Sequence, residues 1–162
     1  MTYPAVRYEG ATGEITATIR RAHLSPDLTW ANGTTAEFLA GGAATDGLFG
    51  LYRWTMPARV PGAAPHFHRT LAESFYVLRG RVTIFDGRDW VDARPGDFVH
   101  VPPGGVHGFR NDTPAVARML IHFAPGAPRE AYFEALVRWS REGRPGPEEV
   151  DAFLREHDNI LV

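Results

Sequence analysis

The sequence predicts an all-β fold, a barrel or sandwich that ends in a short helical segment. Many short runs with strand-like apolar patterns follow one another at close spacing through the middle of the chain. Turn-forming pairs such as Asp86-Gly87 and Pro95-Gly96 separate these runs. After Pro125 the apolar residues change to helical spacing. The length of 162 residues fits one domain with a hydrophobic core.

The expected strands can be placed in order along the chain. An N-terminal arm comes first, in which residues 15–19 alternate like an edge strand, and we expect the arm to pack across the barrel or across a partner subunit. Later strands are expected at residues 35–40, 48–56, 73–78, 81–85, 89–92, 97–101, 106–110 and 116–123. Asp86-Gly87 predicts a hairpin turn with positive φ at both central residues, and Pro102 to Gly105 predicts a sharp break in the chain.

The C-terminal part predicts two helices. Residues 131–141 carry one apolar stripe, and Pro147 can begin a second helix that packs through Val150, Phe153 and Leu154. We therefore expect a barrel with its N-terminal arm over residues 1–125 and a helical tail, packed on the barrel, over residues 126–162.

Composition excludes several classes of site. The chain has no cysteine, so disulfides, thiolate ligands and a cysteine nucleophile are excluded. A net charge near −2 gives no reason to expect nucleic acid or an anionic membrane as a partner. The N-terminal residues lack a signal-peptide pattern, and no run approaches the roughly 20 apolar residues of a membrane span. We expect a cytoplasmic protein.

Three of the seven histidines and one glutamate predict a metal site. His66 and His68 lie on the same face of a strand, because side chains alternate along it. Glu73 follows His68 by an odd number of positions, so the chain must bend or bulge over residues 69–72 to return Glu73 to the histidine side. His107 begins a strand just after the break at Pro102. A carboxylate such as Glu73 among apolar neighbours needs a cation or hydrogen-bond donors in order to stay charged.

The residues around these four resemble the cupin superfamily in two motifs. The first is matched by His66, His68, Glu73 and Gly80, with Gly62 two positions closer than the usual upstream glycine. The second is matched position for position by Gly96, Pro102, Gly104, His107 and Asn111. The short spacer between the motifs is that of small single-domain bacterial cupins. The resemblance implies a conical jelly-roll barrel in which His66, His68, Glu73 and His107 bind one divalent metal. Fe, Mn, Ni, Cu, Co and Zn all suit these ligands, and open positions remain for substrate.

A looser similarity to quercetin dioxygenase-like proteins implies a metal-dependent dioxygenase or related oxidoreductase that acts on a small aromatic or enolic molecule. In that mechanism Glu73 would also accept the substrate proton. Two alternatives stay open: a redox-neutral isomerase, cyclase, lyase or decarboxylase, and a module that binds a small ligand or sugar without turnover.

Candidate substrate-binding residues come from the strands around the motifs. Phe75, Phe109 and Met119 are expected to form an apolar wall. His100 and His122 could line the cavity, although each is more often a structural residue on a barrel strand. Arg53 could bind a carboxylate or phenolate there, although a surface position is the more common place for an arginine.

The strand around Phe75 is apolar on both faces, since Tyr76 and Leu78 lie opposite the expected metal face. Such a sheet needs a second cover, which the arm, the helices or a partner subunit could provide. Cupins of this kind are usually dimers, and the resemblance therefore implies a homodimer.

Overall fold

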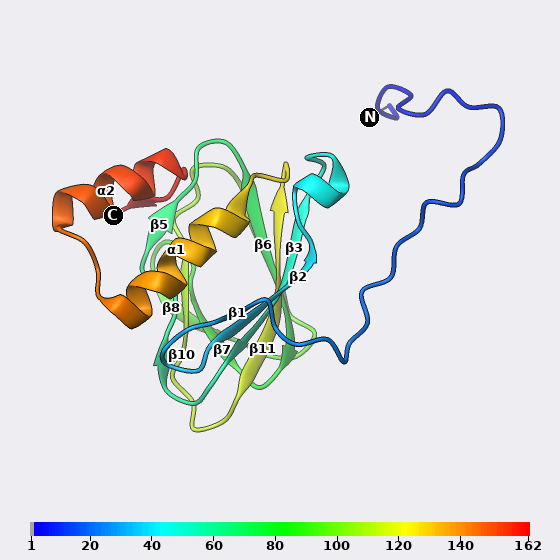
Figure 1. Cartoon of the computed structure of the whole chain (residues 1–162). Coiled ribbons are helices and arrows are strands. Elements are labelled where there is room, and N and C mark those ends of the chain that lie inside the picture. Colours follow the sequence, from blue (N-terminus) through cyan, green and yellow to red (C-terminus); the bar gives the residue numbers. More distant parts are fainter. Residues whose placement is uncertain (1) are drawn as a thin grey trace.

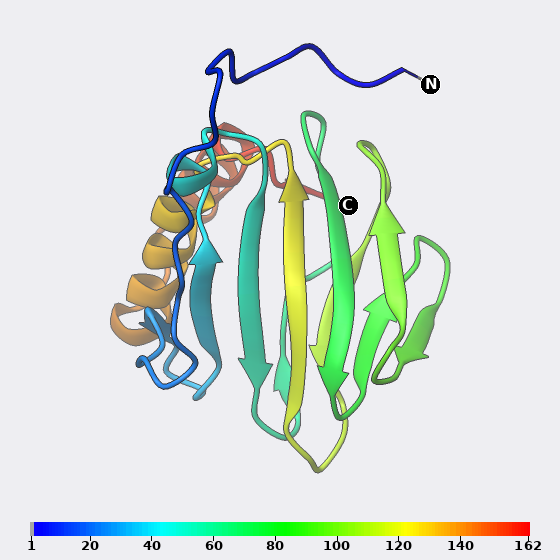
Figure 2. The same ribbon diagram turned by 90° about the vertical axis from the view of Figure 1, so that its right-hand side faces the viewer.

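The computed structural model describes residues 2–162 and shows two antiparallel sheets that face each other, with two helices on one side (Figures 1 and 2). The larger sheet has the order β1-β2-β3-β11-β6-β9 and the smaller one β4-β10-β7-β8, while β12 pairs with β5. The strands are β1 (Leu28–Thr29), β2 (Thr35–Ala40), β3 (Gly50–Met56), β4 (Val60–Pro61), β5 (His66–Phe67), β6 (Ala72–Arg79), β7 (Val82–Phe85), β8 (Trp90–Ala93), β9 (Phe98–Val101), β10 (Gly108–Asn111), β11 (Ala117–Ala124) and β12 (Ile160–Leu161). The expected jelly-roll barrel is confirmed.

Alternation of side chains builds the core between the two sheets. In β3 the residues Tyr52, Trp54 and Met56 are buried and their neighbours are partly exposed. The central strand β11 pairs with both β3 and β6 and alternates in the same way, with Ile121 and Phe123 buried. Each apolar face thus points into the barrel, as period-two patterning requires. The eight strands expected between residues 35 and 123 are all present, with ends shifted by no more than two residues.

Two expectations about local structure are wrong. Residues 15–19 form no strand: Ile15 and Ile19 are exposed, and the arm runs away from its own barrel instead of packing across it (Figures 1 and 2). Packing of the arm across a partner subunit stays a prediction. The edge of β2 that does not pair with β3 is paired with β1. The arm therefore cannot add a strand there through backbone hydrogen bonds. In the turn after β7 only Gly87 takes a positive φ, because the Asp86 carboxylate accepts hydrogen bonds from the backbone N–H groups of Arg88 and Asp89 and fixes the turn itself.

The C-terminal helices are α1 (Arg129–Glu142) and α2 (Pro147–Glu156), and a 3-10 turn, η1 (Ala43–Thr45), lies before β3. Helix α1 is fastened to the β1 region, since Ser140 Oγ accepts from the Ala31 N–H at 3.1 Å and the Arg141 guanidinium donates to the Thr29 carbonyl at 2.5 Å. Helix α2 buries Val150 and Leu154, and Phe153 packs on Trp139 of α1. The helical tail is therefore part of the packed structure.

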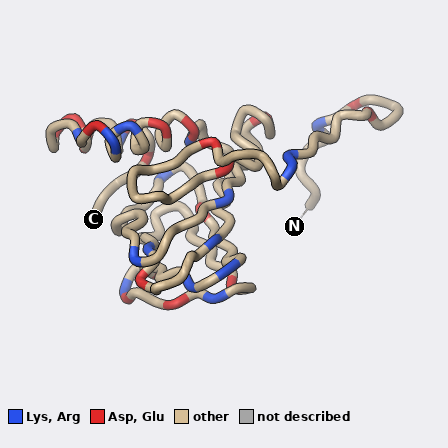
Figure 3. Tube along the Cα trace, turned by 60° about the horizontal axis from the view of Figure 1, so that its bottom comes forward, with Lys and Arg blue, Asp and Glu red and all other residues tan. Residues whose placement is uncertain are grey.

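Charged residues are spread over the molecule. Basic and acidic positions are interspersed along the barrel and both helices (Figure 3). No helix among residues 2–162 is both long enough and apolar enough to pass through a lipid bilayer.

Candidate metal centre and its cavity

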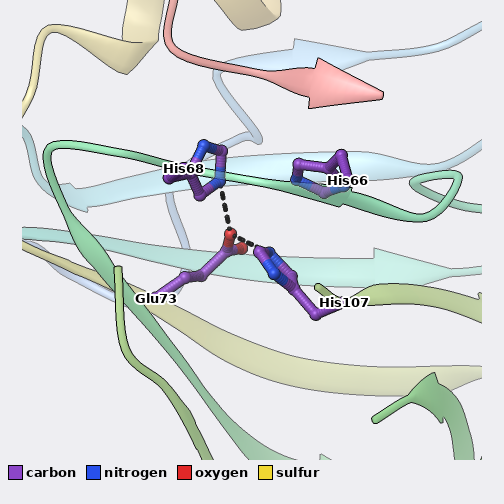
Figure 4. A group of neighbouring side chains, drawn as sticks. All are labelled: His66, His68, Glu73 and His107. Atoms are coloured by element: carbon purple, nitrogen blue, oxygen red, sulfur yellow. Dashed lines mark hydrogen bonds and ion pairs between the residues drawn. The ribbon is translucent and has the colours of Figure 1, made fainter. Parts of the chain in front are cut away.

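Four side chains from two parts of the sequence meet inside the barrel. His66, His68, Glu73 and His107 are each at most 4% exposed, and one possible ligand atom from each lies within 4.8 Å of those of the others. The three imidazoles surround the end of the Glu73 side chain (Figure 4). The structure thus brings together all four residues that the sequence predicts as ligands.

Strand pairing places the two motifs side by side. His66 and His107 form an antiparallel bridge in which each backbone N–H donates to the other residue's carbonyl at 2.8 Å. On the other side of β5, β12 pairs with it through Ile160 and Leu161. The short ligand strand is therefore held on both edges by backbone hydrogen bonds.

The bend predicted between His68 and Glu73 is confirmed, and a residue from the C-terminal tail holds it. Residues 69–70 form a bend, after which β6 begins with Glu73 directed inward. The Asp158 carboxylate accepts hydrogen bonds from the N–H groups of Arg69 and Thr70, at 2.8–3.0 Å, and from the Thr70 hydroxyl at 2.7 Å. These donors hold the pKa of the Asp158 carboxyl below its ordinary value, although its burial works in the opposite direction.

A backbone carbonyl orients each imidazole of the cluster. Nδ1 of His66 lies 2.8 Å from the Ala64 carbonyl, Nδ1 of His107 lies 2.9 Å from that of Gly105, and Nδ1 of His68 contacts that of Asp158. Because a carbonyl can only accept, Nδ1 must carry a proton in all three rings. Each Nε2 therefore faces the centre, where its lone pair can bind a metal or, in the metal-free protein, a second ring proton can be donated to Glu73.

Hydrogen bonds and burial set the charges at the centre. Glu73 Oε2 lies 3.0 Å from Nε2 of His68 and 2.8 Å from that of His107. Burial alone would favour the neutral acid, but hydrogen bonds from His107 and His68 hold the pKa of Glu73 well below its usual range. Burial likewise opposes a charge on His107, yet the hydrogen bond to Glu73 raises the pKa of His107. Burial lowers the pKa of His66 to about 4. An ionised Glu73 thus attracts positive charge to this point.

The donor set fits a divalent metal ion. Three Nε2 atoms and one carboxylate converge from residues held by backbone contacts, and the carboxylate is ionised in a buried place. Nitrogen and oxygen donors of this kind suit first-row transition metals, and four protein ligands leave positions for other molecules on an ion that takes five or six.

The cluster opens into a cavity of about 370 Å³, of which His66 and Glu73 form part of the wall. This volume is within the usual range for sites of small organic molecules. The wall combines residues from the N-terminal region, the barrel, both helices and β12. Its large apolar side chains are Trp30, Trp54, Phe109, Ile121, Phe123, Tyr132, Phe133, Leu136, Trp139, Leu154 and Leu161.

Only one of the three residues expected to form the apolar wall lines the cavity. Phe109 lines the cavity. Phe75 and Met119 are fully buried in the core and do not reach the cavity wall. Phe75 packs behind Phe109 with ring centroids 5.8 Å apart and lies 5.9 Å from the His107 ring. It therefore supports the Phe109 and His107 rings from within the core.

Three of the polar candidates lie outside the cavity. Arg53 is on the outer face of β3 and forms an ion pair with Glu37, with Nε 2.8 Å from Oε1. His100 is exposed and lies 3.1 Å from the Ser74 hydroxyl, while His122 stacks on Phe49. All three occupy the alternate, outward positions of their strands. They take the structural or surface positions given above as the more common ones, and they do not line the cavity as candidate substrate-binding residues.

Helix α1 contributes functional candidates that the sequence patterns missed. Arg129, Tyr132 and Phe133 line the cavity, and Arg129 is only 4% exposed. The apolar stripe of α1 predicts that the helix buries one face against the barrel. An amphipathic pattern does not show which part of the barrel that face contacts. An arginine two positions before that stripe is present in the sequence, but its burial could not be read there.

Comparisons with known proteins agree with the geometry. Residues 52–123 match a family model described as a cupin domain, Cupin_2. A quercetin 2,3-dioxygenase from Bacillus subtilis (strain 168) is 40% identical over 71 residues. This match covers 44% of the present chain and 20% of the dioxygenase, so the similarity spans about a fifth of that longer relative.

Solved structures share the barrel. One is a predicted oxalate decarboxylase from Thermotoga maritima, with a TM-score of 0.60 and 18% identity over 67% of this chain and 99% of that one. Another is KdgF from Halomonas sp., with a TM-score of 0.59 and 16% identity over 68% and 94% of the two chains. The polyketide cyclase RemF from Streptomyces resistomycificus has a TM-score of 0.54 and 23% identity over 68% and 80%. At these identities the likeness establishes the fold alone.

Proposed function

We propose that this chain, in which residues 52–123 form a cupin domain, is a metal-dependent dioxygenase or related oxidoreductase that acts on a small aromatic or enolic molecule. The observation that carries the proposal is the buried cluster of three histidines and one glutamate at the wall of a cavity lined by aromatic side chains. A closed structural metal site has no need of such a cavity, whereas a catalytic one does.

The similarity to a quercetin 2,3-dioxygenase supports the oxidative version of this chemistry. Residues 52–123, which match the cupin family model, contain both ligand motifs, and flavonols such as quercetin carry the phenolic and enolic hydroxyls that the proposal requires. The activity and substrate of that relative are proposals for the present chain, since the match covers a fifth of its length.

A divalent metal held by His66, His68, Glu73 and His107 would supply Lewis acidity toward a substrate hydroxyl and, if redox-active, a site for dioxygen chemistry. The protein itself positions the three Nε2 atoms through the backbone carbonyls at each Nδ1. Glu73 is ionised and reaches the cavity wall, so its carboxylate can accept a proton from a substrate hydroxyl.

The aromatic wall binds and shields the substrate. Trp54, Phe109 and Phe133 pack edge to face, with centroids 6.1 Å apart for Trp54 and Phe109 and 5.2 Å apart for Trp54 and Phe133. Rigid rings in such contacts present flat apolar surfaces that suit a planar substrate. They also exclude water from the cluster, which strengthens electrostatic interactions there.

Oxygen uptake tests the proposal. Protein reconstituted with iron should consume dioxygen in the presence of quercetin or a simpler phenolic or enolic compound, with product formed in step. Glu73→Gln should lower the rate at least about 100-fold, as for loss of a general base. Glu134→Gln, at an exposed glutamate of α1, is the matched control and should leave the rate unchanged.

Two results would overturn the oxidative proposal. Conversion of substrate without oxygen uptake would show a redox-neutral reaction. Recovery of every bound compound unchanged, with iron present, would show a ligand-binding module.

A further inference from the structure

The cavity wall holds unpartnered hydrogen-bond donors. Among residues 2–162, three buried side-chain polar atoms lack a hydrogen-bond partner: Thr34 Oγ1, Trp54 Nε1 and Arg129 Nε. All three residues line this one cavity, and each is at most 6% exposed. Because buried polar groups are nearly always paired, their concentration in one place indicates a ligand that accepts hydrogen bonds.

Arg129 is buried without a carboxylate. Its Nη1 donates to the His157 carbonyl at 2.7 Å, and its Cζ lies 4.2 Å from the centroid of the Tyr132 ring. None of the ion pairs found among the described residues includes Arg129. A buried guanidinium is costly unless an anion neutralises it, and its planar donors match a carboxylate.

The charges around the cavity are unbalanced. Glu73 is the single acidic residue in the wall, whereas Arg129 and Arg144 are both basic. A bound divalent metal would add further positive charge. Arg144 is exposed, so it can attract an anion from solvent toward the buried Arg129.

One aromatic ring separates Arg129 from the metal cluster. The Phe123 ring lies 5.1 Å from Arg129 Cζ and 6.2 Å from the His68 ring, measured to centroids. A planar molecule lying along this wall can therefore reach Arg129 with one end and the cluster with the other.

We infer that the substrate of this cavity is a small aromatic carboxylate whose carboxylate binds Arg129, with Trp54 and Thr34 as further donors. The inference names the substrate class of the site in the proposed function and rests on that proposal for the chemistry, but the anion site itself does not depend on the metal.

Calorimetric binding of two matched probes tests it, with metal-depleted and with zinc-loaded protein. Naphthalene-2-carboxylate should bind both forms at least about tenfold more tightly than the neutral naphthalene-2-carboxamide, as expected for a charge-assisted pair. Arg129→Gln should remove most of this preference and leave binding of the carboxamide unchanged. Arg138→Gln, at an exposed position of the same helix, should bind both probes like the wild type.

Trp54→Phe keeps an aromatic ring at this position but removes the indole N–H donor, and it keeps the inference testable if Arg129→Gln does not fold. It should weaken binding of the carboxylate several-fold more than binding of the carboxamide, because only the loss of contact area is common to the two probes. Equal binding of the two probes, or no binding of the carboxylate at millimolar concentration, would overturn the inference. A preference that survives Arg129→Gln but disappears on removal of zinc would also overturn it, because the metal would then be the anion receptor. An Arg129-dependent preference in metal-depleted protein would uphold the anion site even if the oxygen-uptake experiment failed.

Discussion

At the scale of single residues, the site depends on which imidazole nitrogen faces the centre. Backbone carbonyls at all three Nδ1 atoms decide this before any ion arrives. Preorganised ligands of this kind lose little conformational freedom when a metal binds. Because these imidazoles are buried, adding a proton to them can lower the stability of the metal-free protein.

Metal-free protein should lose stability in mild acid through His66. Its folded pKa is about 4 and its ordinary value about 6.5, so between these pH values only the unfolded chain binds the proton. Stability is therefore present above pH 6.5 and lost as the pH falls, by roughly 2–3 kcal/mol between pH 6.5 and pH 4.5. The raised pKa of His107 does not cancel this loss, because its effect lies above pH 6.5. Urea unfolding with a chelator, at both pH values, measures it.

His66→Gln provides the comparison for this pH effect. The variant should show a flatter pH dependence over the same range, because glutamine does not titrate. An equal loss of stability in the wild type and in His66→Gln would refute the role of His66.

Local spacing predicts three of the four cluster residues, whereas His107 lies 34 positions after Glu73 and was joined to them by the resemblance of the second motif. His66 and His68 share a face by alternation, and Glu73 follows after one bend. Arg53, His100 and His122 were harder to place, because strands with apolar residues on both faces do not reveal which face is inside. A shift of one position in the assignment moves a side chain from the cavity to the surface.

At the scale of elements, the C-terminal tail completes the ligand strand. Asp158 contacts His68 through its carbonyl and holds the bend at residues 69–70 through its carboxylate, and β12 pairs with β5. The tail therefore holds the metal ligands in place without binding the metal itself. Substitutions of residues that hold metal ligands commonly weaken metal binding.

Asp158→Ala should weaken metal binding about 10- to 100-fold, because the bend that directs Glu73 inward loses its acceptor. Competition for zinc with a coloured chelator measures the affinity. Asp151→Ala, which removes an exposed carboxylate from α2, is the control and should bind zinc like the wild type. Unchanged affinity in Asp158→Ala would show that the bend holds without the tail.

No pattern in the sequence indicates this element. Asp158 lies 90 positions after His68, and a strand of two residues carries no periodicity. The barrel strands could be predicted because each is long enough to alternate. Contacts between short segments that are distant in sequence depend on tertiary packing and leave no local pattern. The same holds for the position of α1 at the cavity.

At the scale of the whole molecule, the outer face of the larger sheet carries exposed apolar side chains on β6 and β9. Tyr76 and Phe98 are paired on neighbouring strands and are 42% and 65% exposed, and Leu78 is 40% exposed. No helix lies over this face (Figure 2). These exposed apolar residues support the proposal of a homodimer, since apolar patches of this kind commonly mark protein contacts.

Light scattering should give the mass of a dimer, and Phe98→Asp should shift it toward that of a monomer. Val91→Asp changes an exposed apolar residue of β8 in the smaller sheet and should leave the mass unchanged. A monomeric mass for the wild type at micromolar concentration would rule out the proposed dimer.

Metal content per chain tests the central claim most directly, on protein purified without chelators and measured by mass spectrometry of the elements. The account predicts about one divalent transition metal per chain in the wild type and in His100→Ala, an exposed histidine outside the cavity. It predicts little or none in His107→Ala. A folded His107→Ala that keeps the full metal content of the wild type would contradict the assignment of the site.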